Sequence, residues 1–276
     1  MMFDNLPGRN LDRYRILRQV GENPLGPIFQ AHDPNLQRDV AIQLIQPSIT
    51  ARPDFSDDFI RTARAAARLD HPNLVQVFDF SQSREASYLV MEFIPGDHLE
   101  GLLHEMRRSG QWILLGEAVQ IVRQMAHVME YVRVQGVPQR SVNPSAIMFK
   151  PVPNDNLPYL PVLTDLGFAG VLEWGLAENP LIDPIYLSPE GAVGRATDAR
   201  SDVYVLGILL YELVTGQPPF PIESIEDAVR YHTRQPLPAP RSVRPDIPAG
   251  LEAIIVRALE KNPEARYPNP AALANE

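Results

Sequence analysis

The sequence has 276 residues, with 34 acidic and 25 basic side chains, 28 prolines and no cysteine. A hydrophobic fraction of 45% and a charged fraction of 21% are typical of a globular protein. The lack of cysteine excludes disulfides and thiolate chemistry, and the net charge of −9 argues against a nucleic-acid-binding protein. Only two basic residues are lysines, Lys150 and Lys261, which genomic bias alone would explain.

The first ninety residues read as strands with one helix. Alternating or bounded apolar runs predict strands at 14–20, 27–31, 39–45, 74–80 and 87–93, with a turn at 21–26. Pro53 and Asp54 open a helix in which Phe59, Thr62, Ala63 and Ala66 share one face.

After Pro95 and Gly96 the chain becomes mainly helical, with helices expected at 117–134, 202–213, 224–232 and 251–259. Residues 272–276 read as the middle of a last helix, so the chain is expected to be cut there. The longest apolar run, 203–210, is far shorter than the ~20 residues of a spanning helix, and no signal core opens the chain. A cytoplasmic location is therefore expected, and a longer membrane-anchored parent protein stays open.

Nine short motifs occur in one order along the chain. They are Gly21-Glu22-Asn23-Pro24-Leu25-Gly26-Pro27-Ile28, Val40-Ala41-Ile42-Gln43, His71-Pro72-Asn73, Met91-Glu92-Phe93-Ile94, Gln139-Arg140-Ser141-Val142-Asn143-Pro144-Ser145-Ala146, Asp165-Leu166-Gly167, Ser188-Pro189-Glu190, Ser201-Asp202-Val203-Tyr204 and Asn262-Pro263-Glu264-Ala265-Arg266-Tyr267. Through them the chain resembles the protein kinase family, specifically bacterial Ser/Thr kinases, over essentially its whole length.

The resemblance implies an α+β, protein kinase-like bilobal fold. A small antiparallel β lobe with its αC helix is expected at 1–94 and a larger, mainly helical lobe at 95–276. Four matching residues are structural in the family: Arg140, Glu190, Asp202 and Arg266. Glu190 and Arg266 are expected to form an ion pair, and Asp202 is expected to bond the backbone of the catalytic loop.

The positions that perform phosphoryl transfer in the family are mostly changed. Gln43 stands for the lysine that holds the phosphates and Thr62 for the glutamate that orients it. Ser141 stands for the aspartate that accepts the hydroxyl proton, Asn143 for the catalytic-loop lysine and Ala146 for a metal-binding asparagine. Asp165 alone remains as a metal ligand. No lysine precedes Lys150, so no neighbouring strand supplies the missing one.

The nucleotide pocket gives a mixed expectation. Asn23 replaces a glycine of the phosphate loop, and Pro24 and Pro27 carry no N–H. The candidate pocket residues are Gly21, Gly26, Ile28, Ala41, Met91, Glu92, Ile94, Met148 and Asp165. Weak binding of ATP or another nucleotide and a purely structural role for these residues both stay open, and neither a cofactor nor a metal is expected.

Asp183 lies where active kinases usually carry threonine. It is either a loop residue that has drifted, or a fixed negative charge that pairs with Arg140.

These substitutions lead to the hypothesis of a catalytically inactive kinase-like domain, a pseudokinase that acts as a protein-binding, scaffolding or allosteric signalling module. The expected partner is a protein such as an active kinase or another signalling protein, with a homodimer left open and no nucleic acid or membrane. Its docking surfaces would include the exposed sides of 44–52 and 222–233. The alternative is an atypical nucleotide-binding transferase or very weak kinase using Asp165 and a divalent metal. A third reading is a spacer between other domains.

Overall fold

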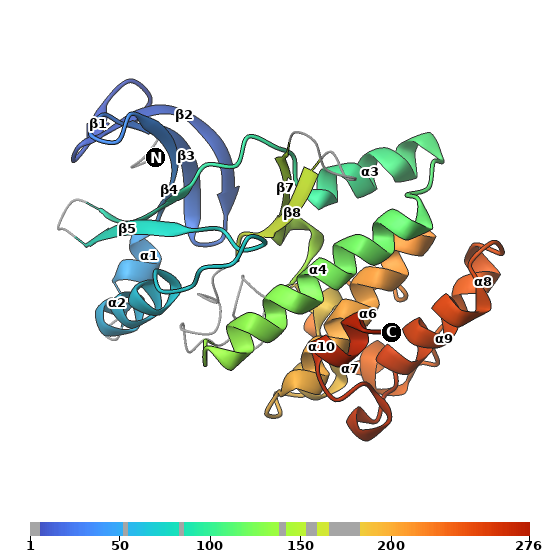
Figure 1. Ribbon diagram of the computed structural model, residues 1–276. Coiled ribbons are helices and arrows are strands. Elements are labelled where there is room, and N and C mark those ends of the chain that lie inside the picture. Colours follow the sequence, from blue (N-terminus) through green and yellow to red (C-terminus); the bar gives the residue numbers. More distant parts are fainter. Residues whose placement is uncertain (1–5, 52–54, 83–85, 138–141, 153–158, 166–182) are drawn as a thin grey trace.

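The structure is a computed structural model of residues 1–276 that describes residues 6–51, 55–82, 86–137, 142–152, 159–165 and 183–276. A curved antiparallel sheet with two helices beneath it forms one end of the molecule, and a group of helices forms the other (Figure 1). The expected α+β bilobal architecture is confirmed. No helix in the described part of the chain is both long and apolar enough to cross a bilayer.

The sheet contains the first six strands of the chain in the order β1-β2-β3-β4-β6-β5, and all neighbouring pairs are antiparallel. Its members are β1 (Asn10–Leu11), β2 (Tyr14–Asn23), β3 (Gly26–Asp33), β4 (Arg38–Leu44), β5 (Val77–Gln82) and β6 (Ser87–Glu92). Between β4 and β5 lie α1 (Pro47–Thr50) and α2 (Phe55–Ala66).

Strand β4 is buried on both faces, and this decides where its side chains point. Val40, Ile42 and Leu44 belong to the apolar cluster on one face of the sheet. Ala41 and Ile45 belong to the larger cluster that continues into the helical lobe. Because successive side chains of a strand point to opposite faces, Gln43 lies on the same face as Ala41 and Ile45.

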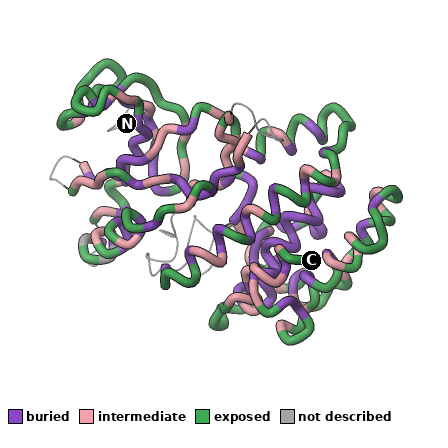
Figure 2. The backbone as a smooth tube through the Cα atoms, in the orientation of Figure 1, coloured by how far each residue is buried: buried purple, intermediate pink, exposed green. Residues whose placement is uncertain are grey.

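The helical lobe is built around α6 (Ala199–Thr215), in which 14 of 17 residues are buried; the tube in Figure 2 is accordingly purple along most of this helix. Asp198 caps α6 by accepting a hydrogen bond from Arg200 N, and Ser201 bonds back to Asp198 N, which satisfies the first turn. Around α6 lie α3 (Leu99–Ser109), α4 (Leu115–Val134), α5 (Pro189–Ala192), α7 (Ile225–Arg234), α8 (Pro240–Val243), α9 (Ala249–Ala258) and α10 (Pro270–Ala274).

Five short elements, two strands and three 3-10 turns, complete the described architecture. The hairpin of β7 (Ile147–Pro151) and β8 (Tyr159–Leu163) follows the 3-10 turn η1 (Pro144–Ala146). Two further 3-10 turns, η4 (Pro184–Tyr186) and η5 (Pro263–Ala265), contact α6. The sequence reasoning gave no expectation for β7, β8 or α3.

The predicted elements differ from the observed ones mainly at their ends. The strand expected at 74–80 begins only at Val77, because Leu74 instead forms a bridge with Leu163 of β8. The helix expected after Pro53 is confirmed as α2, and its predicted face is buried: Phe59, Thr62, Ala63 and Ala66 are at most 7% exposed.

Candidate functional site

Gln43 lies at the centre of the candidate site, in register between Ile28 of β3 and Leu89 of β6. Its side chain is almost fully buried, with 2% of the residue exposed. The Nε2 group donates to the carbonyl oxygens of Gly26 and Leu44, each at 2.9 Å, and Oε1 accepts from Asn23 Nδ2 at 2.8 Å. Gln43 is thus a hydrogen-bonded residue inside the sheet lobe.

The loop between β2 and β3 is a tight hairpin in which Asn23 is paired with Gly26. Asn23 Oδ1 accepts hydrogen bonds from Leu25 N at 2.9 Å and from Gly26 N at 3.3 Å. The loop predicted at 21–26 is therefore shorter than expected, because β2 continues through Asn23.

Thr62 lies on the buried face of α2 together with Phe59 and Ala63, and is 7% exposed. Phe59 packs edge-on against Phe80 of β5, with ring centroids 6.1 Å apart. This contact fixes α2 beneath the sheet (Figure 1).

The apolar candidates for the base side of the pocket are brought together. Ala41 and Met91 are direct partners across β4 and β6 and belong to one buried cluster with Ile94. Ile28 and Met148 are partly buried and pack against the same cluster. Gly21 lies opposite Ile28 across the β2–β3 pair.

Glu92 has a partner that sequence reasoning missed. Its carboxylate accepts from Lys150 Nζ at 2.5 Å, so an ion pair joins the end of β6 to β7. The backbone N–H of Glu92 donates to Gln76 O at 2.9 Å. A separation of 58 residues left no signal in the sequence for this contact.

Asp165 lies two residues after the end of β8. Ile147 is in register with Leu163, and Thr164 N donates to Ala146 O at 2.8 Å, so Ala146 and Asp165 are neighbours. Asn143 caps η1 through its Oδ1, which accepts from Ala146 N at 2.9 Å and from Ser145 Oγ at 2.8 Å. Ser141 and Arg140 lie outside the described residues.

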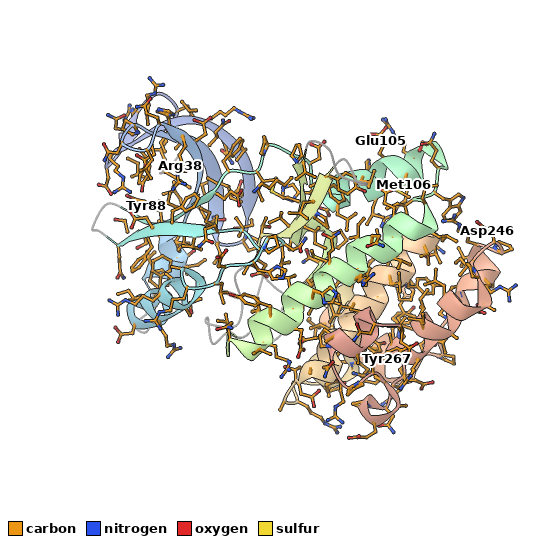
Figure 3. All side chains as sticks on the ribbon, viewed as in Figure 1. Arg38, Tyr88, Glu105, Met106, Asp246 and Tyr267 are labelled. Carbon is orange, nitrogen blue, oxygen red and sulfur yellow. The ribbon has the colours of Figure 1, made fainter. Side chains whose placement is uncertain are left out.

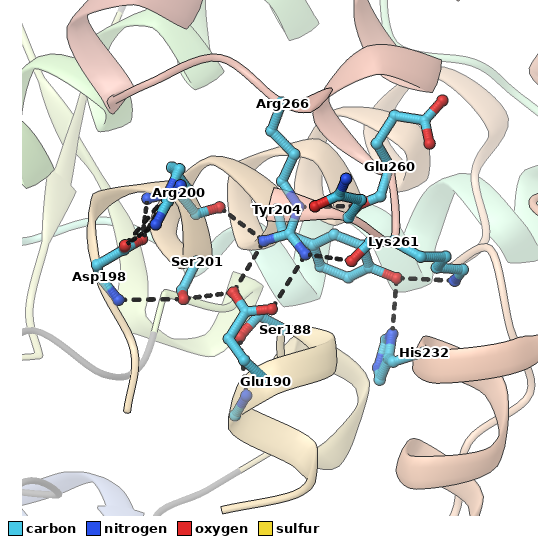
Figure 4. Close-up of polar contacts among 12 residues, drawn as sticks. Ser188, Glu190, Asp198, Arg200, Ser201, Tyr204, His232, Glu260, Lys261 and Arg266 are labelled. Atoms are coloured by element: carbon cyan, nitrogen blue, oxygen red, sulfur yellow. Dashed lines mark hydrogen bonds and ion pairs between the residues drawn. The ribbon is translucent and has the colours of Figure 1, made fainter. Parts of the chain in front are cut away.

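Glu190 and Arg266 face each other in the helical lobe (Figure 4). Arg266 Nη1 and Nη2 donate to the two carboxylate oxygens at 2.8 and 3.0 Å, which is a bidentate pair. The guanidinium also donates to the carbonyl oxygens of Glu260, Arg200 and Lys261, and it lies over the Tyr204 ring at 4.8 Å. Hydrogen bonds from Arg266 and Ser201 outweigh the effect of burial and lower the pKa of Glu190.

A hydrogen-bonded chain continues from the same region and was not foreseen. Lys261 Nζ donates to Tyr204 Oη at 3.1 Å, and Tyr204 lies 3.2 Å from His232 Nδ1. His232 Nε2 is 3.2 Å from Pro184 O, so Nε2 carries the proton and Nδ1 accepts from Tyr204 (Figure 4). Burial lowers the pKa of His232 to about 4 and that of Lys261 to about 8. This chain connects η4 with α6 and α7.

Asp183 is placed at the start of η4. Its carboxylate accepts from Ile185 N at 3.0 Å, and burial raises its pKa. The Arg140 partner that the charge hypothesis needs lies outside the described residues. Nearby, Tyr186 donates to the buried Glu212, which also pairs with Arg107 of α3.

Asp202 lies in the first turn of α6, and burial raises its pKa to about 7, against the opposing charge of Arg133. Its expected bond to the catalytic loop stays a prediction, since residues 138–141 of that loop lie outside the described residues.

A six-stranded lobe with α2 beneath it, followed by a helical lobe built on a buried central helix, defines the two-lobed protein kinase architecture. A sequence model of the protein kinase domain matches residues 14–276, and the chain belongs to this family.

Among its relatives, the chain is 31% identical to serine/threonine-protein kinase Pkn1 of Myxococcus xanthus over 276 residues, which covers 99% of this chain and 39% of Pkn1. It is 32% identical to pkn3 of the same organism, covering 96% of this chain and 49% of pkn3. For PknE of Mycobacterium bovis the identity is 33%, covering 94% of this chain and 44% of PknE. The chain thus spans less than half the length of these curated relatives.

The crystal structure of the Mycobacterium tuberculosis PknI kinase domain has the same fold. The TM-score is 0.76 at 24% sequence identity, and the match covers 97% of this chain and 95% of that chain. At this level of identity the likeness concerns the fold alone.

These relatives contradict the expectation of a catalytically inactive, scaffolding kinase-like domain that is not an enzyme, because they are named serine/threonine-protein kinases and align with nearly the whole chain. The alternative of an atypical transferase or very weak kinase using Asp165 is not favoured by them either. The hypothesis of inactivity depended on the residue types at Gln43, Thr62, Asn143 and Ala146. Residue types show which of the family's usual contacts are missing, but they do not show which other contacts take their place.

The family implies a nucleoside triphosphate with a divalent cation at the candidate site. The apolar cluster of Ala41, Met91 and Ile94 suits a purine base. The phosphate side does not fit in the described conformation, because Gln43 is neutral and buried and the N–H groups of Leu25 and Gly26 already donate to Asn23.

Proposed function

We propose that this chain is a serine/threonine protein kinase domain that transfers a phosphoryl group to a Ser or Thr hydroxyl of a partner protein. One observation carries the proposal: the kinase domain match over 14–276, together with relatives of 31–33% identity that are named serine/threonine-protein kinases. The bidentate Glu190–Arg266 pair supports it, because it fixes the segment that follows η4 to the helical lobe.

The proposal places strict demands on the residues of the site. Phosphoryl transfer depends mainly on positioning and on neutralising charge, and Gln43 and Asn143 supply no charge. Asp165, beside Ala146, is the carboxylate of this site that would hold a divalent cation. The proposed cofactor is a nucleotide whose base packs on Ala41 and Met91.

The proposed partner is the protein that carries the acceptor hydroxyl, and the proposed compartment is the cytoplasm. The exposed sides of 44–52 and 222–233 remain the proposed docking surfaces. Helix α7 supports the second of these, because its polar side is exposed while Ala228 and His232 anchor it to the lobe.

The test is transfer of radiolabelled phosphate from ATP to the chain itself and to a mixed Ser/Thr peptide library, with Mg²⁺ or Mn²⁺. The Asp165→Asn variant is expected to lose roughly 10²-fold or more of the rate, the usual cost of removing one preorganised electrostatic group. Asp246→Asn is the matched control, since Asp246 lies at the far side of the helical lobe (Figure 3). Label no greater than in a protein-free blank, with either metal, would reject the proposal.

A further inference from the structure

At the tip of the β2–β3 hairpin, the backbone N–H groups already form hydrogen bonds within the hairpin. Pro24 has no N–H, and the N–H groups of Leu25 and Gly26 both donate to Asn23 Oδ1, at 2.9 and 3.3 Å. Residues 24–26 therefore present no backbone donor that is not already engaged. In glycine-rich loops such donors are the groups that bind phosphate oxygens.

The amide of Asn23 is in turn held by Gln43. Asn23 Nδ2 donates to Gln43 Oε1 at 2.8 Å, while Gln43 Nε2 donates to Gly26 O and Leu44 O, each at 2.9 Å. Both hydrogens of the Gln43 amide and its oxygen are thus used, in a position only 2% exposed. A satisfied buried amide of this kind resists rearrangement, because any opened group loses its partner.

Two further contacts fix the tip onto the strand behind it. Gln46 N donates to Leu25 O at 2.7 Å, and the Leu25 side chain is 8% exposed in the main apolar cluster. Gly26 has φ +145°, and a Cβ there would lie 2.5 Å from Leu44 O. The hairpin is thus drawn against the end of β4 and the start of α1.

We propose that Asn23 and Gln43 form an amide clasp that holds the glycine-rich hairpin closed and withholds its N–H groups from the phosphate chain of a nucleotide. The clasp makes the closed cleft selective for the nucleoside part, and a triphosphate gains the loop contacts only when Asn23 releases Leu25 and Gly26. This inference rests on the proposed function, since it concerns regulation of the same nucleotide site.

Release of the clasp should be measurable as a gain in affinity for phosphate. Asn23→Gly removes the acceptor for both N–H groups and the donor to Gln43, and glycine tolerates the turn. We expect the dissociation constant of ATP to fall about tenfold, the equivalent of about 1.4 kcal/mol, while that of adenosine changes less than about twofold. Asn35→Gly is the matched control, because Asn35 is an exposed asparagine in the neighbouring β3–β4 hairpin. Its backbone N–H donates to Asp33 Oδ1, and this bond is kept when the side chain is removed.

Calorimetric titration with ATP and with adenosine, each with Mg²⁺, gives these constants for the unaltered chain and both variants. Three results would each overturn the clasp. They are an unchanged dissociation constant of ATP in Asn23→Gly, an equal change in the dissociation constants of ATP and adenosine, and no binding of either ligand to the unaltered chain or to Asn23→Gly. If ATP binding tightens as expected but no variant transfers phosphate, the clasp stands and the proposed kinase activity fails.

A second measurement needs no variant. Amide hydrogen exchange of the unaltered chain should show Leu25 and Gly26 protected, since both N–H groups are bonded to Asn23. Exchange of both amides at the rate of an unstructured peptide would contradict the clasp, even if Asn23→Gly failed to fold.

Discussion

Gln43 shows how a single side chain can be placed correctly by sequence and still be misread. The resemblance assigned it to the position of a phosphate-binding lysine, and the strand register indeed sets it on the face of β4 that Ala41 and Ile45 share. Its partners, Asn23 and Gly26, are 20 and 17 residues away and carry no pattern that names them. The sequence therefore predicts the strand position of Gln43, while only the structure of the packed hairpin shows its hydrogen bonds.

The buried position of Gln43 leads to a prediction for the residue that the family usually carries there. Gln43→Lys should lower the free energy of unfolding more than Gln43→Met. This buried side chain is hydrogen-bonded to the Asn23 amide and to the carbonyls of Gly26 and Leu44, and a buried ammonium is costlier there than a lost amide. For Gln43→Met we expect a loss of about 1–3 kcal/mol from the carbonyls of Gly26 and Leu44 left unpaired. Urea unfolding measures both.

The control for this pair is Gln19→Lys, an exposed glutamine on β2 of the same sheet. Its effect should stay within about 0.5 kcal/mol, as for most surface substitutions. Equal stability of Gln43→Lys and the unaltered chain would show that the site accommodates a cation. Burial at position 43 would then not disfavour a lysine.

At the scale of elements, the helices with regular apolar spacing could be predicted from the sequence. Elements that depend on contacts with distant parts of the chain could not. The α2 face and the long helix α4 follow from apolar spacing alone. Helix α3 has Leu99, Leu103 and Met106 buried on one face, but its eleven residues are polar on average, and it was not predicted from the sequence. Helices of this length depend on tertiary packing more than on their own propensity.

The β7–β8 hairpin could not be expected from propensity. Pro151 and Pro161 lie within its strands, and proline usually argues against a strand except at an edge. In a two-stranded sheet both strands are edges, so the prolines are tolerated. This hairpin sets Asp165 beside Ala146, so the arrangement of the candidate site was beyond the reach of local sequence signals.

Gly96 gives a prediction for the connection between the lobes. A Cβ at Gly96 would lie 1.8 Å from the carbonyl oxygen of Phe149 in β7, so Gly96→Ala must displace the connection or the hairpin. We expect a loss of stability of about 2 kcal/mol or more, in the range of overpacked sites. Differential scanning calorimetry measures the shift in melting temperature.

Gly101→Ala is the matched control for Gly96→Ala. Gly101 lies nearby in α3, and nothing is within 4 Å of its added Cβ. Because alanine is the better helix former, this variant should gain up to about 0.5 kcal/mol. A loss of stability equal in both variants would show that the Phe149 contact is not the cause.

The two lobes share one main apolar cluster. The main apolar cluster runs from Phe59 under the sheet to Leu273 in α10, and the Glu92–Lys150 pair bridges the two lobes at the same place. A buried charge or a protonation event in the helical lobe should therefore be visible in global unfolding. The buried His232 and the half-buried Asp202 have pKa values shifted in opposite senses.

The opposite shifts predict opposite pH dependences of stability. Burial lowers the pKa of His232 to about 4, so between pH 6.5 and 4 the unfolded chain binds a proton that the folded chain refuses, and stability falls as the pH falls. Burial raises the pKa of Asp202 to about 7, so its contribution is complete at acidic pH and is lost as the pH rises from about 4 towards 7. In the unaltered chain the two effects on the free energy of unfolding therefore oppose each other, and its pH profile does not separate them.

Substitution separates the two groups. Taking the free energy of unfolding of the unaltered chain minus that of His232→Gln, we expect the difference to increase from pH 4.5 to 6.5 and then to stay constant, by up to about 3 kcal/mol for a shift of this size. Glutamine keeps a donor for Pro184 O without a titrating ring. The corresponding difference for Asp202→Asn should decrease over pH 4.5–7. Denaturant titrations at each pH measure both differences; a flat His232 curve would mean that water reaches the ring and that the chain from Lys261 to Pro184 is open in solution.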